Sequence, residues 1–179
     1  MATGFLLAAD GKDAILRWCV LWVQGLGYRL ATTEIRGIYM FELHSKLAED
    51  TLVVGEFKLC QLLIHRDANY PWFILVPKRP KVTEVYHLSK QDRMQLMQES
   101  CILAEALVDV FAPDKINIAA LGNMVPQLHM HHVARYITDG AWPNPIWGVL
   151  SAVGYQQEVL EHRIESVVNV LVGDDFSRP

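Results

Sequence analysis

The sequence has few of the features that mark disulfide-rich, membrane or nucleic-acid-binding proteins. Its three cysteines, Cys19, Cys60 and Cys101, form no Cys-x-x-Cys pair, so reduced thiols are expected rather than disulfides or a zinc site. No stretch reaches the roughly 18 uninterrupted apolar residues of a membrane span. A formal charge of −4, without a lysine or arginine cluster, offers no surface for a nucleic-acid backbone. We therefore expect a soluble, cytoplasmic protein that binds neither membrane nor nucleic acid.

The periodicity of the apolar residues predicts an α+β domain. Residues 42–50 are predicted to form a short helix, and residues 58–65 and 72–77 two strands joined by a turn. Ser89, with Asp92 three positions later, is typical of the start of a long helix. Two further strands are predicted at 115–121 and 127–136, and a last helix is predicted to end at Gly173. This order predicts an antiparallel sheet with helices on one face and the long helix packed on it.

The long helix, predicted at 89–112, has apolar residues on more than one side. One set is predicted to face the sheet: Met94, Met97, Cys101, Ala104, Val108 and Phe111. Further apolar residues lie outside that stripe: Leu96, Leu103, Leu107 and Val110. Because they exceed what one sheet face covers, they predict that the protein forms a homodimer.

The most informative segment is residues 126–135, which read Pro-Gln-Leu-His-Met-His-His-Val-Ala-Arg. In a β-strand, side chains alternate between the two faces. Gln127, His129 and His131 would then share one face, with Leu128 and Met130 on the core side. Two imidazoles and an amide on one surface indicate a functional site rather than a core strand.

This segment resembles the strand of the histidine-triad (HIT) superfamily of nucleotide hydrolases and transferases, which reads His-x-His-x-His followed by two apolar residues. Residues 70–78 resemble an earlier strand of the same family. Residues 141–148, Ala-Trp-Pro-Asn-Pro-Ile-Trp-Gly, resemble a bacterial HIT branch whose signature reads Gln-x-His-x-His. The flanking residues that support the alignment are Gly122, Asn123, Val125 and Arg135. The resemblance covers about residues 40–148 and implies a HIT-like fold.

The resemblance implies an enzyme that cleaves a nucleoside phosphoramidate or a dinucleoside polyphosphate through a covalent nucleotidyl-histidine. A neutral imidazole is a competent nucleophile at physiological pH. By alignment, His129 is the nucleophile, and His131 binds the phosphate or assists the leaving group. Gln127 takes the place of the first triad histidine, which supports the geometry.

Further contacts to the small-molecule nucleotide are also implied by the resemblance. Asn123 aligns with a residue that binds the phosphate, and Asp67, or alternatively His65, with a ribose contact. Trp142 and Trp147 either wall the nucleotide pocket or pack their own loop. No cofactor and no metal are implied.

Three alternatives remain open. In a second alignment frame, His129 is the first triad member, His131 the nucleophile and Val133 the third. The spacing of His129 and His131, with His132 beside them, also fits a metal-binding protein. The last alternative is a nucleotide-binding module without significant turnover, because three polar groups of the family are replaced. The replacing residues are Gln127, Trp72 and Met124.

The domain organisation is predicted in three parts. Residues 1–39 match nothing in the family and form an N-terminal extension, either non-essential or the product of a mis-assigned start. Residues 40–148 form the HIT domain, and residues 149–179 a C-terminal helix and tail. Within the extension, an apolar stripe that includes Trp18 and Trp22 predicts a helix.

We predict that residues 1–39 can be removed without loss of folding, because both matching segments lie beyond Met40. A chain that starts at Met40 should stay in solution and melt at the temperature of the full chain, as measured by circular dichroism. A large fall in melting temperature would instead place the helix with Trp18 and Trp22 in the core.

Overall fold

The computed structural model describes residues 41–171, 173 and 175–178, so the predicted N-terminal extension and its helix lie outside the described residues. The elements follow in the order α1 (Ser45–Asp50), β1 (Thr51–Glu56), β2 (Cys60–His65), β3 (Trp72–Pro77), η1 (Val85–His87), α2 (Lys90–Phe111), β4 (Lys115–Ala119), β5 (Met130–Arg135) and α3 (Gln157–Leu171).

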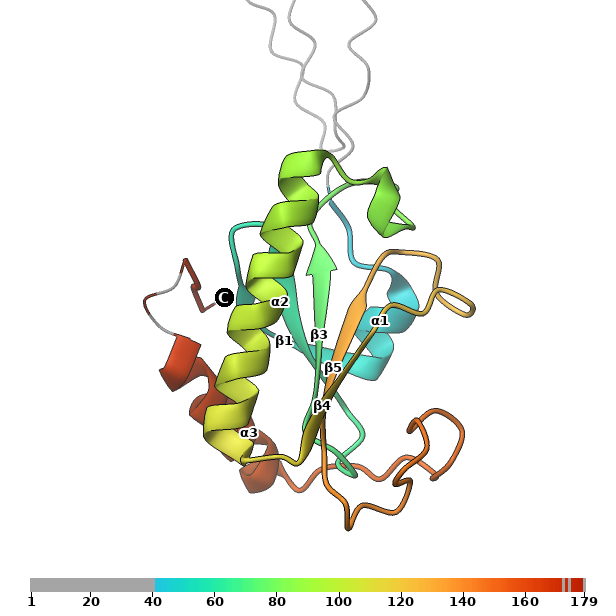
Figure 1. The fold of residues 1–179 in the computed structure, drawn as a ribbon, viewed down its shortest axis with the longest axis vertical. Coiled ribbons are helices and arrows are strands. Elements are labelled where there is room, and N and C mark those ends of the chain that lie inside the picture. Colours follow the sequence, from blue (N-terminus) through green and yellow to red (C-terminus); the bar gives the residue numbers. More distant parts are fainter. Residues whose placement is uncertain (1–40, 172, 174, 179) are drawn as a thin grey trace, which may run out of the picture. The chain divides into compact units, whose positions relative to one another are not determined.

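The strands form one antiparallel sheet in the order β1-β2-β3-β5-β4, with the long helix α2 lying over one face, roughly along the strands (Figure 1). This confirms the predicted α+β class and the packing of the long helix on the sheet. Ser89 begins α2 as predicted, because its hydroxyl accepts a hydrogen bond from the backbone N–H of Asp92 at 3.0 Å. No helix within the described residues has the length and apolarity needed to cross a bilayer.

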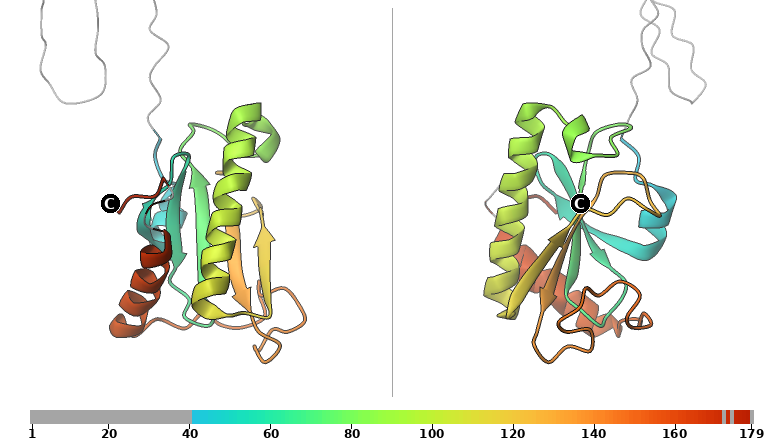
Figure 2. Two further views of the ribbon diagram at one scale, coloured as in Figure 1. Left: turned by 60° about the vertical axis from the view of Figure 1, so that its left-hand side comes forward. Right: turned by 45° about the vertical axis from the view of Figure 1, so that its right-hand side comes forward.

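Both faces of the sheet are covered, which differs from the prediction that helices lie on one face. Figure 2 shows α2 on one side and α1 on the other. Phe73 and Leu75 of β3 point to the α2 side, and Trp72 and Ile74 to the side on which Leu47 of α1 packs. A strand buried on both faces reads as a continuous apolar run, which is why β3 was predicted with its observed bounds.

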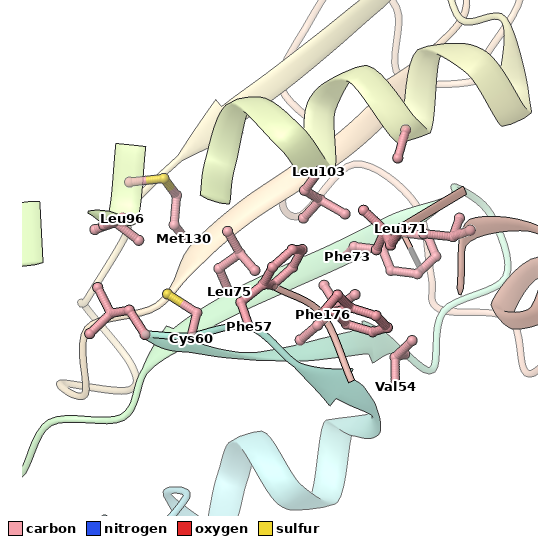
Figure 3. Close-up of a cluster of buried hydrophobic side chains, with 14 of the residues drawn as sticks. Val54, Phe57, Cys60, Phe73, Leu75, Leu96, Leu103, Met130, Leu171 and Phe176 are labelled. Carbon is pink, nitrogen blue, oxygen red and sulfur yellow. The ribbon is translucent and has the colours of Figure 1, made fainter. Parts of the chain in front are cut away.

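The larger core lies between the sheet and helices α2 and α3. Figure 3 shows Leu96 and Leu103 of α2 above Phe73 and Leu75 of β3. The members of this core on α2 and α3 are Leu96, Leu103, Ala106, Leu107, Val167, Val168 and Leu171.

The predicted sheet-facing stripe of α2 is therefore wrong except at its end, where Phe111 packs against this core. Met94 and Met97 are 67% and 57% exposed, whereas Leu96 and Leu103 are buried. The reason is that the buried face also carries Glu99, whose carboxylate accepts hydrogen bonds from the backbone N–H groups of Leu59 and Cys60 at 2.7 and 2.9 Å. Because this charged residue interrupts the leucines, the sequence pattern did not indicate that this side of α2 packs on the sheet.

Several element bounds also differ from the prediction. The first helix begins at Ser45 rather than at residue 42, and β2 begins at Cys60 because residues 58–59 belong to the turn after β1. Strand β1 was not predicted. It contains Gly55, where an added β-carbon would collide with the ring of Phe176 that packs on the strand.

We predict that Leu103→Ala lowers the free energy of unfolding by roughly 3 kcal/mol, because it leaves a cavity under α2. The matched substitution Val159→Ala, at an exposed position on α3, should change it by less than about 0.5 kcal/mol. Urea unfolding followed by circular dichroism measures both values. Equal losses for the two variants would contradict the observed burial of Leu103 on the side of α2 that faces the sheet.

Candidate active site

The imidazoles of His129 and His131 lie together on the α1 side of the sheet. His131 belongs to β5 and pairs with Ile74 of β3, and His129 precedes β5 by one residue. The predicted strand at 127–136 is therefore shorter, but the alternation of side chains continues back to His129. The two ring centroids are 4.8 Å apart. Both side chains are buried.

The proton of His129 is fixed by the backbone. Its Nδ1 lies 2.7 Å from the carbonyl oxygen of Gln127. A carbonyl oxygen only accepts, so Nδ1 carries the proton and Nε2 keeps its lone pair. Burial lowers the pKa of His129, and the hydrogen bond to Gln127 opposes that shift. His129 is therefore neutral at physiological pH, with a nucleophilic nitrogen free.

The proton of His131 is fixed on the other nitrogen. Its Nδ1 accepts a hydrogen bond of 3.0 Å from the indole Nε1–H of Trp72. Since an indole nitrogen only donates, Nδ1 of His131 carries no proton and Nε2 does. Burial first, and then the neighbouring His129, His65 and His132, lower the pKa of His131 to about 3. The two adjacent imidazoles thus present opposite tautomers.

Trp72 is held in place by aromatic neighbours. The ring of His65 on β2 stacks on its indole, with centroids 3.9 Å apart and planes inclined by 12°. Trp147 meets the indole edge-on at 6.2 Å and lies 5.5 Å from His131. Nδ1 of His65 accepts from the backbone N–H of Asp67 at 3.1 Å, so its Nε2 carries the proton. These contacts fix the plane of the indole and hence the direction of its N–H group.

The side-chain amide of Gln127 pairs with the backbone ahead of α1. Its Oε1 accepts from the backbone N–H of His44 at 2.8 Å, and its Nε2 donates to the carbonyl oxygen of Glu42 at 2.9 Å. An amide offers a donor and an acceptor side by side, which matches the edge of an extended backbone, whereas the two nitrogens of an imidazole diverge. Gln127 therefore ties this segment to the residues that carry His129.

Arg135, at the end of β5, orders the loop that follows. It is almost fully buried, and its guanidinium donates two hydrogen bonds to the carboxylate of Asp139, at 2.8 and 2.9 Å. The ring of Trp142 lies over the guanidinium at 5.8 Å. The same loop brings Trp147 against His131. Of the two tryptophans, Trp142 packs the loop and Trp147 lies at the imidazoles.

Of the other predicted nucleotide contacts, His65 lies near the two imidazoles. Asn123 is exposed in the connection between β4 and β5, and its side chain makes no hydrogen bond with another described residue. One carboxylate oxygen of Asp67 accepts from the backbone N–H groups of Asn69 and Val153, both at 3.0 Å. The structure therefore brings His65 to the imidazoles through Trp72, and uses Asp67 to hold the chain near Val153.

His132 points away from this site, into the core under α2. Its Nε2 lies 2.7 Å from the hydroxyl of Ser100, and its Nδ1 lies 3.2 Å from the carbonyl oxygen of Met130. Burial lowers the pKa of His132 to about 4. It cannot join His129 and His131 around one metal ion. In the described part of the chain, no three histidine, cysteine or acidic side chains are arranged to hold one.

Comparison with known proteins identifies the family. The family model described as HIT domain matches residues 46–138, which is more than half of the chain. The chain belongs to the HIT family. No curated protein matches it.

Three crystal structures of histidine triad proteins are similar to the HIT chain over most of its length. A protein from Marinobacter aquaeolei VT8 is 44% identical, with 74% of this chain and 96% of that one covered and a TM-score of 0.72. A protein from Bradyrhizobium japonicum is 42% identical, covering 73% and 97%, with a TM-score of 0.72. A protein from Sinorhizobium meliloti 1021 is 37% identical, also covering 73% and 97%, with a TM-score of 0.72.

Within this HIT domain, sequence reasoning missed the role of Trp72. A tryptophan in place of a family histidine was interpreted as the loss of a polar group, but its indole N–H still supplies a hydrogen bond to His131. Two signals were available. A buried indole N–H needs a hydrogen-bond acceptor. The sequence predicted such an acceptor, His131, on the strand with a polar face.

We predict that acid weakens the fold before carboxylates titrate. The pKa values of His131 and His132 in the folded chain, about 3 and about 4, lie below the unfolded value of about 6.5. The unfolded chain therefore binds more protons in that interval, and stability is lost as the pH falls below about 6.5. Each buried histidine should contribute about 1.4 kcal/mol per pH unit.

Urea unfolding between about pH 7 and about pH 5 measures this slope. His132→Gln should reduce it, whereas His162→Gln, at an exposed position on α3, should leave it unchanged. A stability that does not vary over this interval would show that the buried histidines are not neutral in the folded chain.

Proposed function

We propose that the chain is a hydrolase or nucleotidyl transferase of small-molecule nucleotides that works through a covalent nucleotidyl-His129 intermediate. Its substrate is a nucleoside phosphoramidate or a dinucleoside polyphosphate. The observation that carries the proposal is the pair of opposite tautomers on one surface. His129 presents a bare Nε2, and His131, beside it, presents an Nε2–H.

In the first step, Nε2 of His129 attacks the α-phosphorus of the bound nucleotide. A bond forms between phosphorus and Nε2, and the bond to the leaving group breaks with its electron pair. Nε2–H of His131 donates to a phosphate oxygen and stabilises the charge that develops there. Water, or a second acceptor, then displaces the nucleotide from His129.

The fixed tautomers support this assignment of roles over the second alignment frame. In that frame His131 would be the nucleophile. Its Nδ1 is already occupied by Trp72, and its Nε2 carries the proton, so neither nitrogen presents a lone pair. Of these two residues, His129 is the one that keeps a free lone pair, on Nε2, while it is neutral.

Other side chains serve the reaction by position. Gln127 supports His129 through its own carbonyl oxygen and through its pairing with residues 42–44. Asn123 offers an exposed amide for a phosphate contact. For the ribose contact, His65 is better supported than Asp67, because an oxygen of Asp67 is already used within the fold. The proposal requires no cofactor or metal.

We predict that His129→Asn removes nearly all turnover of diadenosine triphosphate, because the nucleophilic nitrogen is lost. Nucleotide binding should be retained, since the phosphate and ribose contacts remain. His131→Asn should lower kcat by a smaller factor, of roughly 10². Steady-state kinetics and isothermal titration with a nucleoside monophosphate measure turnover and binding separately.

Acid quench and peptide mapping test the covalent step directly. The nucleotide should be found on the peptide with His129 in the unmodified chain and be absent in His129→Asn. A nucleotide on His131 would support the second frame. Binding without turnover in the unmodified chain would support a nucleotide-binding module instead.

We also predict a homodimer, with α2 at or near the interface. The side of α2 that faces away from the sheet exposes Met94, Met97 and Val108, and Cys101 lies on the same side. The sequence analysis assigned the dimer contact to the opposite side of α2, which is the side buried against the sheet. The helix nevertheless has apolar residues on the exposed side that the sheet does not cover. Light scattering should give twice the 20.3 kDa chain mass. Met97→Lys should lower it toward one chain, and a monomeric unmodified chain would contradict the prediction.

A further inference from the structure

The two linkages named above make different demands on the enzyme. When a phosphoric anhydride is cleaved, the leaving oxygen belongs to a phosphate, whose second pKa is about 6, so it departs as a stable anion. When a phosphoramidate is cleaved, the leaving nitrogen would depart as an amide anion, which is far too basic to form in water. It must receive a proton from an acid as the bond breaks.

His131 is the group that would supply this proton, and its geometry opposes that role. An imidazolium has N–H groups on both nitrogens. A proton on Nδ1 of His131 would point at the indole N–H of Trp72, 3.0 Å away, with two donors face to face. The stack on His65 and the contact with Trp147 hold the indole in that orientation.

The charges around His131 act in the same direction. The titratable groups that act on it are His129 ahead of β5, His65 on β2 and His132 on β5 itself, and each disfavours a positive charge on its ring. Within the described residues, no acidic side chain is among the groups that perturb His131. Its Nε2–H can therefore donate a hydrogen bond to phosphate, but it is a poor source of a proton.

The geometry points to a site for phosphoric anhydrides, such as dinucleoside polyphosphates, rather than for phosphoramidates, with Trp72 as the positioning residue that sets this preference. The inference rests on the proposed function, because it concerns the leaving group of the same reaction. Trp72 acts through His131 and touches no reacting atom.

The step balances without an acid. Nε2 of His129 supplies the electron pair for the new bond to the α-phosphorus. The bond from that phosphorus to the bridging oxygen breaks, and its electron pair stays on the oxygen of the departing phosphate. No proton is transferred, and Nε2–H of His131 keeps its proton throughout.

A matched pair of substrates tests the inference on the full chain. Diadenosine triphosphate and adenosine phosphoramidate both transfer an adenylyl group to His129 and differ in the leaving atom. We expect the larger kcat/KM for the anhydride, nearly constant from about pH 8 to about pH 6.5. For the phosphoramidate, kcat/KM should be smaller and rise by about tenfold per unit fall in pH, because the proton must come from solution.

Trp72→Phe removes the indole N–H and keeps an apolar ring against His65. Nδ1 of His131 is then free to take a proton, so the preference should move toward the phosphoramidate by about tenfold or more, and its pH dependence should flatten. Trp142→Phe, which removes a tryptophan that packs on Arg135, is the control and should leave the ratio unchanged.

The possible outcomes separate this inference from the proposed function. If neither substrate labels His129, the proposed function fails, and the inference fails with it. If both label His129 but the unmodified chain cleaves the phosphoramidate at least as fast, with a flat pH profile, only the preference is overturned. An unchanged ratio in Trp72→Phe would overturn the role of Trp72. Should that variant not fold, the two pH profiles of the unmodified chain still decide the preference.

Discussion

One hydrogen bond, from the indole of Trp72 to Nδ1 of His131, organises the site. It joins the side chains of β3 and β5 across the sheet and gives a buried imidazole a single allowed tautomer. Without it, no other hydrogen bond that the structure describes would fix the proton of His131 on one ring nitrogen. Because of it, His131 presents a proton beside the lone pair of His129, whose own proton is held by the carbonyl oxygen of Gln127. The packing around Trp72, from His65 on one side and Trp147 on the other, keeps this bond in place.

The alternation of side chains along β5 separates chemistry from packing. His131 points to the site, whereas His132, the next residue, points into the core and meets Ser100 of α2. Both are neutral because burial lowers their pKa values. The energetic cost of burying them uncharged is offset by hydrogen bonds to each ring, and it makes the fold sensitive to acid. Because β5 carries His131 toward the site and His132 into the core, protonation of either histidine at low pH would disturb both the site and the packing of the core.

The parts of the structure that local pattern determines were predictable from the sequence. Strand β3 is an apolar run that ends in proline, and α2 begins at a serine that caps it. The shared face of His129 and His131 followed from strand alternation. Contacts between distant residues were not predictable. Glu99 is buried because of backbone groups 40 and 39 positions away, which reversed the assignment of the buried face of α2. From the sequence, Gln127 and Trp72 were interpreted as replacements that lose a polar group. Their hydrogen-bond partners, residues 42–44 and His131, lie far away in the sequence.

The central claim is that His129 and His131 hold their protons on opposite nitrogens. Nitrogen-15 NMR of the imidazoles measures this directly, because protonated and unprotonated ring nitrogens have well-separated chemical shifts. At physiological pH, the account predicts a protonated Nδ1 and bare Nε2 in His129, and a bare Nδ1 and protonated Nε2 in His131, with neither ring charged. Identical tautomers in the two rings, or a charged His131, would contradict it.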